Sequence, residues 1–425
     1  MSPGGTVSRG GATDTPVDFG EFVRRRGGRG SLVVQPRMGI SDPVRMRAGL
    51  RATRAARATT VGTITLDSYT RVADLAAAER ALADGVQLNG YPIVNHPYDV
   101  TRALLDGVRD DDFPVQVRHG SAVPAHIFEA LVALRLNASE GGPVSYCLPY
   151  GRTPLADSVA NWRRGTELFA TLRDHGAEPH LETFGGCMLG QLCPPSQLVA
   201  ISVLEALFFH QHGVRSLSVS YAQQTNFAQD VEAVAALRRL CADLLPTPNW
   251  HVVVYAYMGV YPYTTAGAYR LLERAAELAL TTGAERLIVK TEAEAQRIPT
   301  IAENVTALER AGAVRASPTP SQDDSETYGE ALALVHAVLN LDADLGRALL
   351  AAFRHGILDI PFCLHPDNMG RTRAYLDTDG RLRWAATGSM PLPAGSGTRV
   401  LTSAGLLDDL SYVRRSYDTP IGAAP

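Results

Sequence analysis

Charged and polar residues stand at the ends of several short apolar runs, and their types are those that bind anions or donate hydrogen bonds. Arg118 ends the run PVQVR and precedes a His-Gly turn, where its guanidinium fork is suited to binding a carboxylate. Tyr221 ends SLSVSY, and its hydroxyl can donate a hydrogen bond. Arg37 and Asn95 hold similar places after other apolar runs. Because strand ends build the active site of a barrel, these residues are the first candidates.

Lys290 is the only lysine among the 40 basic residues, and it ends the apolar run RLIVK. Arginine supplies positive charge everywhere else, so the retained ammonium group stands out. An ammonium differs from a guanidinium in being a compact point charge with an adjustable pKa. A lysine of this kind can also form a Schiff base with a carbonyl substrate. Lys290 is therefore a candidate for catalysis or for binding.

The elements that position these residues alternate in type. Short β-branched runs are separated by amphipathic stretches, many of which end in glycine, as helix C-termini prefer. This alternation over about 330 residues predicts parallel strand–helix–strand units. The nine expected strands, near the eight of a closed barrel plus one accessory strand, are 31–36, 63–68, 92–96, 114–120, 178–185, 216–221, 251–257, 286–291 and 358–362. We therefore predict an α/β fold of the TIM-type (β/α)8 barrel class.

The predicted catalytic barrel spans residues 31–362. Residues 1–30, which are rich in Gly, Arg, Ser and Thr, are expected to form a flexible N-terminal arm. Residues 363–425 carry several glycines and prolines and are expected to form an appended C-terminal subdomain.

Composition and motifs exclude several classes of protein. The hydrophobic content of 45% supplies a large core, and the net charge of −4 argues against a nucleic-acid-binding surface. Neither a membrane span nor a secretory signal is expected, because long apolar runs are missing. Five cysteines without a C-x-x-C pair suit reduced thiols, so a cytoplasmic location is expected. No dinucleotide-binding, P-loop or serine-hydrolase motif is found.

Nine segments taken together resemble the large (epsilon) subunit of adenosylcobalamin-dependent glutamate mutase, also called methylaspartate mutase. They run in the family's order from about residue 31 to residue 390, and this collinearity carries the resemblance. The segments are VVQPRMGISDP (33–43), TITLDSYTR (63–71), LNGYPIVNHP (88–97), RHG (118–120), SEGGPVSYCLPY (139–150), ETFGG with CPPS (182–186 and 193–196), HGVRSLSVSY (212–221), VKTEAEAQRIPT (289–300) and DIPFC with NMGR (359–363 and 368–371).

The resemblance implies a barrel enzyme that rearranges the carbon skeleton of glutamate to 3-methylaspartate, or of a related amino acid, by radical chemistry. The family's cofactor is adenosylcobalamin, and its cobalt ligand lies in an Asp-x-His-x-x-Gly motif of a separate small subunit. That motif is not found in this sequence. The resemblance therefore implies a small cobalamin-binding (sigma) partner chain, in a heterotetramer of two large and two small chains.

The resemblance also assigns residues to the substrate carboxylates. The family holds these groups with three arginines, of which one matches Arg118. The positions expected for the other two fall on Gly85 and Leu181. Either the substrate is less charged than glutamate, or Arg37 and Arg152 replace the two missing groups.

Further roles follow from the same resemblance. Glu205 is expected to meet the substrate ammonium from a helix, and Tyr221 to help position the amino acid. Asn95 and Lys290 are expected to contact the cofactor or the mouth of the site. The resemblance places the contacts with the coenzyme ribose near Gln322 and Glu326, so these two residues are also expected to contact the cofactor.

Two alternatives remain open at this point. One is a Schiff-base lyase or aldolase of the same fold, with Lys290 as the nucleophile and no need for cobalamin. The other is a mutase chain that has lost its activity and persists as a partner subunit.

Overall fold

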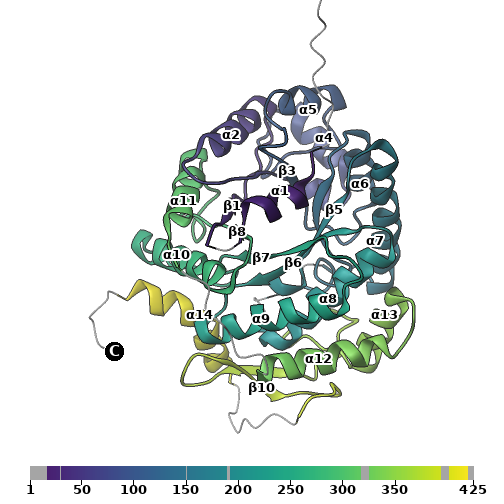
Figure 1. The fold of residues 1–425 in the computed structure, drawn as a ribbon, viewed down its shortest axis with the longest axis vertical. Helices are drawn as coiled ribbons and strands as arrows, with labels where there is room; N and C mark the ends of the chain where they lie inside the picture. Colours follow the sequence, from purple (N-terminus) through teal and green to yellow (C-terminus); the bar gives the residue numbers. More distant parts are fainter. Residues whose placement is uncertain are drawn as a thin grey trace, which may run out of the picture.

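Eight parallel strands form the centre of the molecule in the computed structural model, which describes residues 17–28, 30–149, 151–188, 192–316, 325–393 and 402–419. Their order is β1-β8-β7-β6-β5-β4-β3-β2, and a parallel bridge between Val34 and Thr60 closes the ring. The predicted TIM-type barrel is therefore confirmed (Figure 1). The strands are β1 (Val33–Gln35), β2 (Gly62–Thr65), β3 (Val115–Arg118), β4 (Ala138–Gly141), β5 (His180–Thr183), β6 (Ser216–Ala222), β7 (Trp250–Tyr255) and β8 (Arg286–Ile288).

Helices form an outer layer around this ring (Figure 1). Residues at their ends explain where they start and stop. Asp42 accepts a backbone hydrogen bond at the start of α2, and Thr300 and Glu303 form a reciprocal capping box at the start of α11. Gly283 ends α10 with a φ of 68°, a left-handed angle that favours glycine. The helices are α1 (Phe19–Arg26), α2 (Pro43–Ala55), α3 (Ser68–Arg71), α4 (Leu75–Ala83), α5 (Tyr98–Leu105), α6 (Ala125–Ala133), α7 (Leu155–Ala170), α8 (Pro195–Gln211), α9 (Phe227–Leu244), α10 (Thr265–Thr282), α11 (Ile301–Ala313), α12 (Glu326–Leu339), α13 (Leu345–His355) and α14 (Ser403–Asp418).

Two of the nine expected strands are wrong. Residues 92–96 form a turn, and residues 358–362 lie in a loop, in each case around a proline that has no N–H to donate to a strand ladder. β4 was not among the strands expected from the sequence. Its four residues, ASEG, include no β-branched or aromatic side chain, so the propensity signal that marks the other strands is missing there.

The expected N-terminal arm is too long, because part of it is folded. Residues 1–16 lie outside the described residues, but α1 begins directly after them and runs across one end of the barrel (Figure 1). Phe19, Phe22 and Val23 are buried, at the spacing of an apolar helical stripe. The Phe19 ring lies 5.1 Å from the ring of His180 and 5.0 Å from the guanidinium carbon of Arg286. This helix therefore closes the amino-terminal end of the barrel.

The segments after residue 325 cover the outer face of the barrel beside α8 and α9 (Figure 1). α12 packs on both of these helices, and α13 packs on α7 and α8. The antiparallel hairpin of β9 (Arg373–Leu376) and β10 (Leu382–Ala386) is held to α9 by Gln229, whose amide bonds the backbone of Leu382 in both directions. α14 is held near the start of α10 by Asp418, which accepts hydrogen bonds from the Tyr263 and Thr264 backbone.

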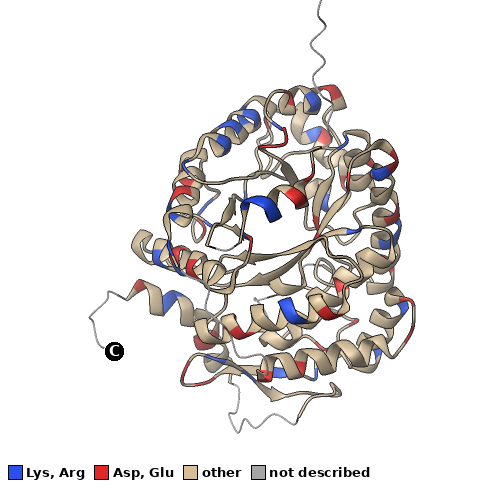
Figure 2. Cartoon of the chain, in the orientation of Figure 1, with Lys and Arg blue, Asp and Glu red and all other residues tan. Residues whose placement is uncertain are grey.

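Charged side chains of both signs are interspersed over the outer helices rather than gathered by sign (Figure 2). Each pair that they form at the surface contributes little to stability. Within the part of the chain that the structure describes, no helix has the length and apolar character needed to cross a membrane.

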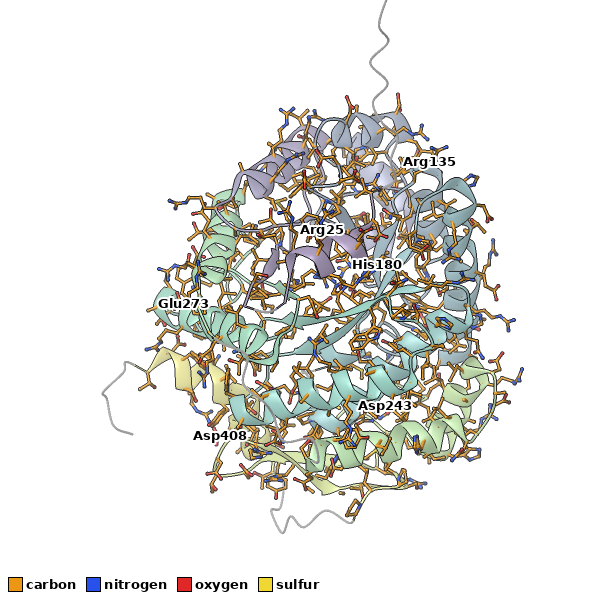
Figure 3. The ribbon with its side chains drawn as sticks, in the orientation of Figure 1. Arg25, Arg135, His180, Asp243, Glu273 and Asp408 are labelled. Carbon is orange, nitrogen blue, oxygen red and sulfur yellow. The ribbon has the colours of Figure 1, made fainter. Side chains whose placement is uncertain are left out.

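We predict that Phe19→Ala lowers the free energy of unfolding by about 3–5 kcal/mol, because it removes the buried ring that α1 packs against the barrel end. The measurement is urea unfolding followed by circular dichroism. The control is Arg25→Ala on the exposed side of the same helix (Figure 3), which should stay within about 0.5 kcal/mol of the wild type. Equal effects of the two changes would contradict the closing role of α1.

Candidate functional site

A cavity of about 540 Å³ opens at the carboxyl ends of the barrel strands. This is the end at which barrel enzymes place their active sites. Residues that end or follow β1, β2, β3, β4, β5, β7 and β8 all reach it. The lining residues are Arg37, Thr65, Ser68, Arg71, Val72, Arg118, His119, Gly120, Glu140, Tyr146, Phe184, Met258, Lys290 and Glu294. We call this cavity the mouth pocket.

Arg118 is a buried cation that lines the mouth pocket. Its Nη2 donates to Glu140 Oε2 at 3.3 Å and to the hydroxyl of Tyr255 at 3.1 Å. Its Nη1 is buried and has no hydrogen-bond partner among the described residues. Since a buried guanidinium N–H is costly to leave unpaired, this arm is available to a bound anion.

Arg71 is a second cation with unused hydrogen-bonding capacity. It ends α3, a single helical turn that starts because Asp67 accepts hydrogen bonds from the backbone of Tyr69 and Thr70. The Arg71 side chain passes close to Gly120, where a Cβ in place of the glycine hydrogen would lie 3.5 Å from Nη1. Its Nε is buried without a partner, and Arg71 forms no ion pair within the described residues. Arg71 and Arg118 therefore both offer free N–H groups to the pocket.

Lys290 and Arg37 share one carboxylate on the other side of the pocket. Glu294 Oε1 lies 2.8 Å from Lys290 Nζ and 3.1 Å from Arg37 Nη1. Burial alone would raise the pKa of Glu294, but the two positive charges outweigh it and hold that pKa at about 2. Burial lowers the pKa of Lys290, and Glu294 opposes that shift. Lys290, Arg37 and Glu294 thus form one ion-paired cluster in the wall of the mouth pocket.

His119 is neutral at physiological pH. Burial, together with the charges of His126, Arg71 and Arg118, lowers the pKa of His119 to about 3. Its Nδ1 accepts from the Ser121 backbone at 3.0 Å.

The pocket therefore holds four cationic side chains against two carboxylates, Glu140 and Glu294. An excess of positive charge with free guanidinium N–H groups suits a small molecule with two carboxylates.

Glu205 does not reach the mouth pocket. It is buried in α8, where its carboxylate accepts hydrogen bonds from the backbone of Val144, Ser145 and Phe184 and from the Ser145 hydroxyl. A Cβ on Gly142 would lie 2.0 Å from a Glu205 oxygen, so the turn after β4 is shaped around this carboxylate. The expected contact of Glu205 with substrate is therefore replaced by a structural role.

Tyr221 also points away from the site. It is fully buried on the outer face of β6, and its hydroxyl donates to Asp230 of α9 at 2.9 Å. Tyr221 shares its phase along the strand with Leu217 and Val219, which belong to the apolar core, whereas Ser218 lies in the lumen beside Glu182. The expectation that Tyr221 enters the mouth is wrong.

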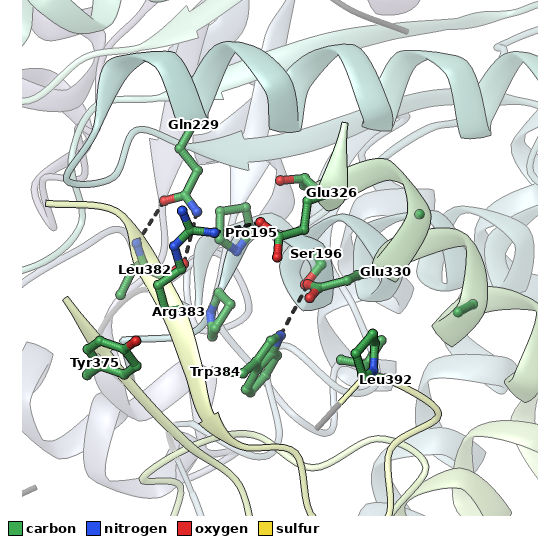
Figure 4. Close-up of a pocket in the computed structure, with 15 residues that line it drawn as sticks. Pro195, Ser196, Gln229, Glu326, Glu330, Tyr375, Leu382, Arg383, Trp384 and Leu392 are labelled. Atoms are coloured by element: carbon green, nitrogen blue, oxygen red, sulfur yellow. Dashed lines mark hydrogen bonds and ion pairs between the residues drawn. The ribbon is translucent and has the colours of Figure 1, made fainter. Parts of the chain in front are cut away.

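Three other expected contacts lie outside the mouth pocket. Arg152 is exposed on the chain before α7. Asn95 donates to the carbonyl of Leu75 at 2.9 Å and does not line the pocket. Glu326 lines a separate cavity of about 730 Å³ between α12 and the β9–β10 hairpin, where it pairs with Arg383 (Figure 4). Gln322 lies outside the described residues.

Gly85 and Leu181 occupy the two positions at which the resemblance places the family's other substrate-binding arginines. Neither residue faces the mouth pocket. Gly85 follows α4 with a φ of 70° and open space around it, as a helix C-terminus favours. Leu181 is fully buried in β5 and belongs to the apolar core, while its neighbour Glu182 faces the lumen. Neither position therefore belongs to the lining of the mouth pocket. Arg71 was not among the candidates from the sequence, although the N-cap pattern at Asp67 and the TITLDSYTR segment place it just after a strand.

We predict a pH signature of the buried Glu205 carboxyl. Burial raises its pKa to about 7 in the folded chain from an ordinary 4.5, although three backbone N–H groups oppose the shift. Between these values the unfolded chain has released a proton that the folded chain retains, so stability falls as pH rises. Relative to Glu205→Gln, the wild type should lose up to about 3 kcal/mol from pH 4.5 to pH 7. Parallel stability curves for the two proteins would contradict this account.

Comparison with known proteins identifies the family. Residues 16–398 match the family model described as methylaspartate mutase E chain (MutE). The glutamate mutase epsilon subunit of Halobacterium salinarum is 33% identical over 77% of this chain and 71% of its own length. That of Desulfitobacterium hafniense is 31% identical over the same shares, and that of Escherichia coli O157:H7 is 29% identical over 77% and 72%.

A solved structure, the truncated 3-deoxy-D-arabino-heptulosonate 7-phosphate synthase from Thermotoga maritima, covers 66% of this chain and 83% of its own. Its sequence identity is 10% and its TM-score 0.36, too low to bear on function. The family match spans most of the chain, including every residue of the mouth pocket. The chain therefore belongs to the methylaspartate mutase E chain family, and its reaction class is that of a mutase, an isomerase.

Proposed function

We propose that this chain is the large subunit of an adenosylcobalamin-dependent mutase that rearranges the carbon skeleton of glutamate, or of a close acidic relative, to the 3-methylaspartate type of product. The observation that carries the proposal is the set of three arginines, Arg37, Arg71 and Arg118, around one pocket at the carboxyl end of the barrel. Family membership supports the reaction class.

In this proposal the free N–H groups of Arg118 and Arg71 hold one substrate carboxylate, and Arg37 holds the other. Each charge-assisted contact of this kind contributes about 1.5–3 kcal/mol. Glu140 Oε1 already accepts from the His119 backbone at 3.1 Å, and its carboxylate is the acceptor in the pocket for the substrate ammonium. Because His119 is neutral, it adds no charge that would repel the ammonium.

The three arginines also favour one of the two kinds of substrate that the sequence left open. A pocket for a less charged amino acid would leave buried guanidinium groups unpaired, which is costly. The free N–H groups of Arg71 and Arg118 therefore favour a substrate with two carboxylates. The compensating role expected of Arg152 is not needed.

The residues at the mouth suit a large cofactor with both apolar and polar edges. Val72, Tyr263 and Ile298 are 69%, 58% and 65% exposed on the loops after β2, β7 and β8, where a partner or a large ring would cover them. Lys290 and Glu294, which line the mouth pocket, offer a donor and an acceptor. When bound, adenosylcobalamin supplies a carbon radical by homolysis of its cobalt–carbon bond.

The chain's own contribution is to orient the substrate and to exclude water. Phe184 lines the pocket and packs edge-on against Tyr255, with ring centroids 5.5 Å apart. Below them the side chains of Glu182, Arg286 and Gln116 form a hydrogen-bonded cluster that fills the lumen under the pocket. A closed floor protects a reactive intermediate from side reactions. A small partner chain would provide the cobalt ligand and cover the mouth, and the name epsilon subunit in the curated relatives supports a second kind of chain.

The geometry gives less support to a Schiff-base enzyme. Such a reaction needs Lys290 as a neutral amine. Burial lowers the pKa of Lys290, but the Glu294 carboxylate, 2.8 Å from Nζ, opposes that shift and stabilises the ammonium form. The role of Lys290 in the proposal is instead to hold the cofactor or substrate at the rim.

We predict that Arg71→Met and Arg118→Met each raise KM for glutamate by about 30-fold or more, since each removes a fork of charge-assisted donors while keeping the bulk of the stem. Arg152→Met is the matched control, because Arg152 is exposed outside the pocket. Steady-state kinetics of the reconstituted two-chain enzyme make the comparison. If Arg152→Met has the larger effect, the clamp assignment is wrong.

We also predict that the purified chain alone binds cobalamin weakly, because half of the site and the lower cobalt ligand belong to the small chain. Spectral titration should show binding at least about tenfold tighter when the small chain is present. Equally tight binding with and without it would show that this chain holds the corrin by itself.

A further inference from the structure

Tyr255 connects the mouth pocket to the centre of the barrel without lining the pocket itself. It ends β7, and Arg118 ends β3, which lies on the opposite side of the eight-stranded ring. The Tyr255 hydroxyl accepts from Arg118 Nη2 at 3.1 Å, and the centroid of its ring lies 5.0 Å from the guanidinium carbon. Tyr255 is fully buried. Its side chain therefore spans the lumen beneath the arginine.

The other side of the hydroxyl is held as firmly. It donates to Glu182 Oε1 of β5. The second oxygen of Glu182 pairs with Arg286 of β8 and accepts from Ser218 and Gln116 at 3.2 Å each. Glu182 and Arg286 are both fully buried, so this pair cannot move without leaving a charge unpaired. Tyr255 is thus anchored from below by a fixed acceptor.

The Tyr255 hydroxyl is a neutral group between the Arg118 guanidinium and the Glu182 carboxylate. It gives Arg118 Nη2 a second acceptor besides Glu140, which sets the plane of the guanidinium group. It also keeps the charge of Glu182 from contacting Arg118 directly. Because this second acceptor is neutral, Glu140 remains the one carboxylate that pairs with Arg118 among the described residues, and the unpaired Nη1 remains the free arm.

We propose that Tyr255 is a positioning residue that fixes the orientation of Arg118 by linking it to the Glu182–Arg286 pair, and so sets the affinity for the substrate carboxylate. The proposal rests on the proposed function, because it assigns the anion bound by Arg118 to the substrate. It concerns a residue that touches neither the pocket nor the reacting atoms.

The test is a double-mutant cycle in the reconstituted two-chain enzyme with adenosylcobalamin. Tyr255→Phe should raise KM for glutamate by about tenfold and change kcat less than about twofold, since it removes one hydrogen bond to a charged group. In the Arg118→Met background the same change should leave KM unaltered, because its effect passes through Arg118. Tyr91→Phe is the control, a buried tyrosine whose hydroxyl bonds Thr101 at 2.8 Å outside the lumen, and it should leave KM unchanged.

Additive effects of Tyr255→Phe and Arg118→Met on KM, in an enzyme that does turn over glutamate, would overturn the positioning role and leave the proposed function standing. If the wild type does not turn over glutamate, the proposed function fails, and the same cycle is read by calorimetric titration with glutarate. Non-additive losses of glutarate binding then support the positioning role, and additive losses or no binding overturn it. Circular dichroism checks folding, and Tyr255→Met, which also lacks the hydroxyl, replaces Tyr255→Phe in the cycle if the latter does not fold.

Discussion

The buried ion pair between Glu182 and Arg286 is the interaction on which the rest of the barrel depends. Both side chains are fully buried in the lumen, and through Gln35, Gln116 and Ser218 they join β1, β3, β5, β6 and β8. Removing one partner of such a pair leaves a charge without compensation, at a cost of about 3–5 kcal/mol. The lumen is therefore a hydrogen-bonded network rather than an apolar core, and each polar group in it constrains its neighbours.

The two ends of the barrel use this network differently. At the amino-terminal end, the apolar stripe of α1 covers it, with Phe19 against His180 and Arg286. At the carboxyl end, Tyr255 and Arg118 extend it to the mouth pocket, where Arg118 Nη1 and Arg71 Nε are buried without a hydrogen-bond partner among the described residues. A hydrogen-bonded floor below a positively charged mouth suits the proposed reaction, because it keeps water from that side of a small anionic substrate.

The sequence predicted the barrel because β-branched runs and helical stretches alternate regularly, and that pattern depends only on local residue types. It predicted the site less well. Successive side chains of a strand point to opposite faces, and where both faces are buried the residue types do not mark which face is the lumen. In β6 the serines at 216, 218 and 220 share the inward phase, and Tyr221 shares the phase of Leu217 and Val219. That alternation was visible in the sequence. Arg71 was missed because a single-turn helix after β2 returns it to the mouth. Arg37, Arg118 and Lys290, which directly end or follow their strands, line the pocket as expected.

The most direct test of the account is the conversion of glutamate to 3-methylaspartate by this chain, reconstituted with its small partner chain and followed by NMR. We expect turnover that requires both the partner chain and adenosylcobalamin. Turnover without adenosylcobalamin, with glutamate trapped on Lys290 by borohydride, would contradict it in favour of a Schiff-base enzyme. A complex that assembles with the small chain and adenosylcobalamin but leaves glutamate unchanged would contradict it as well.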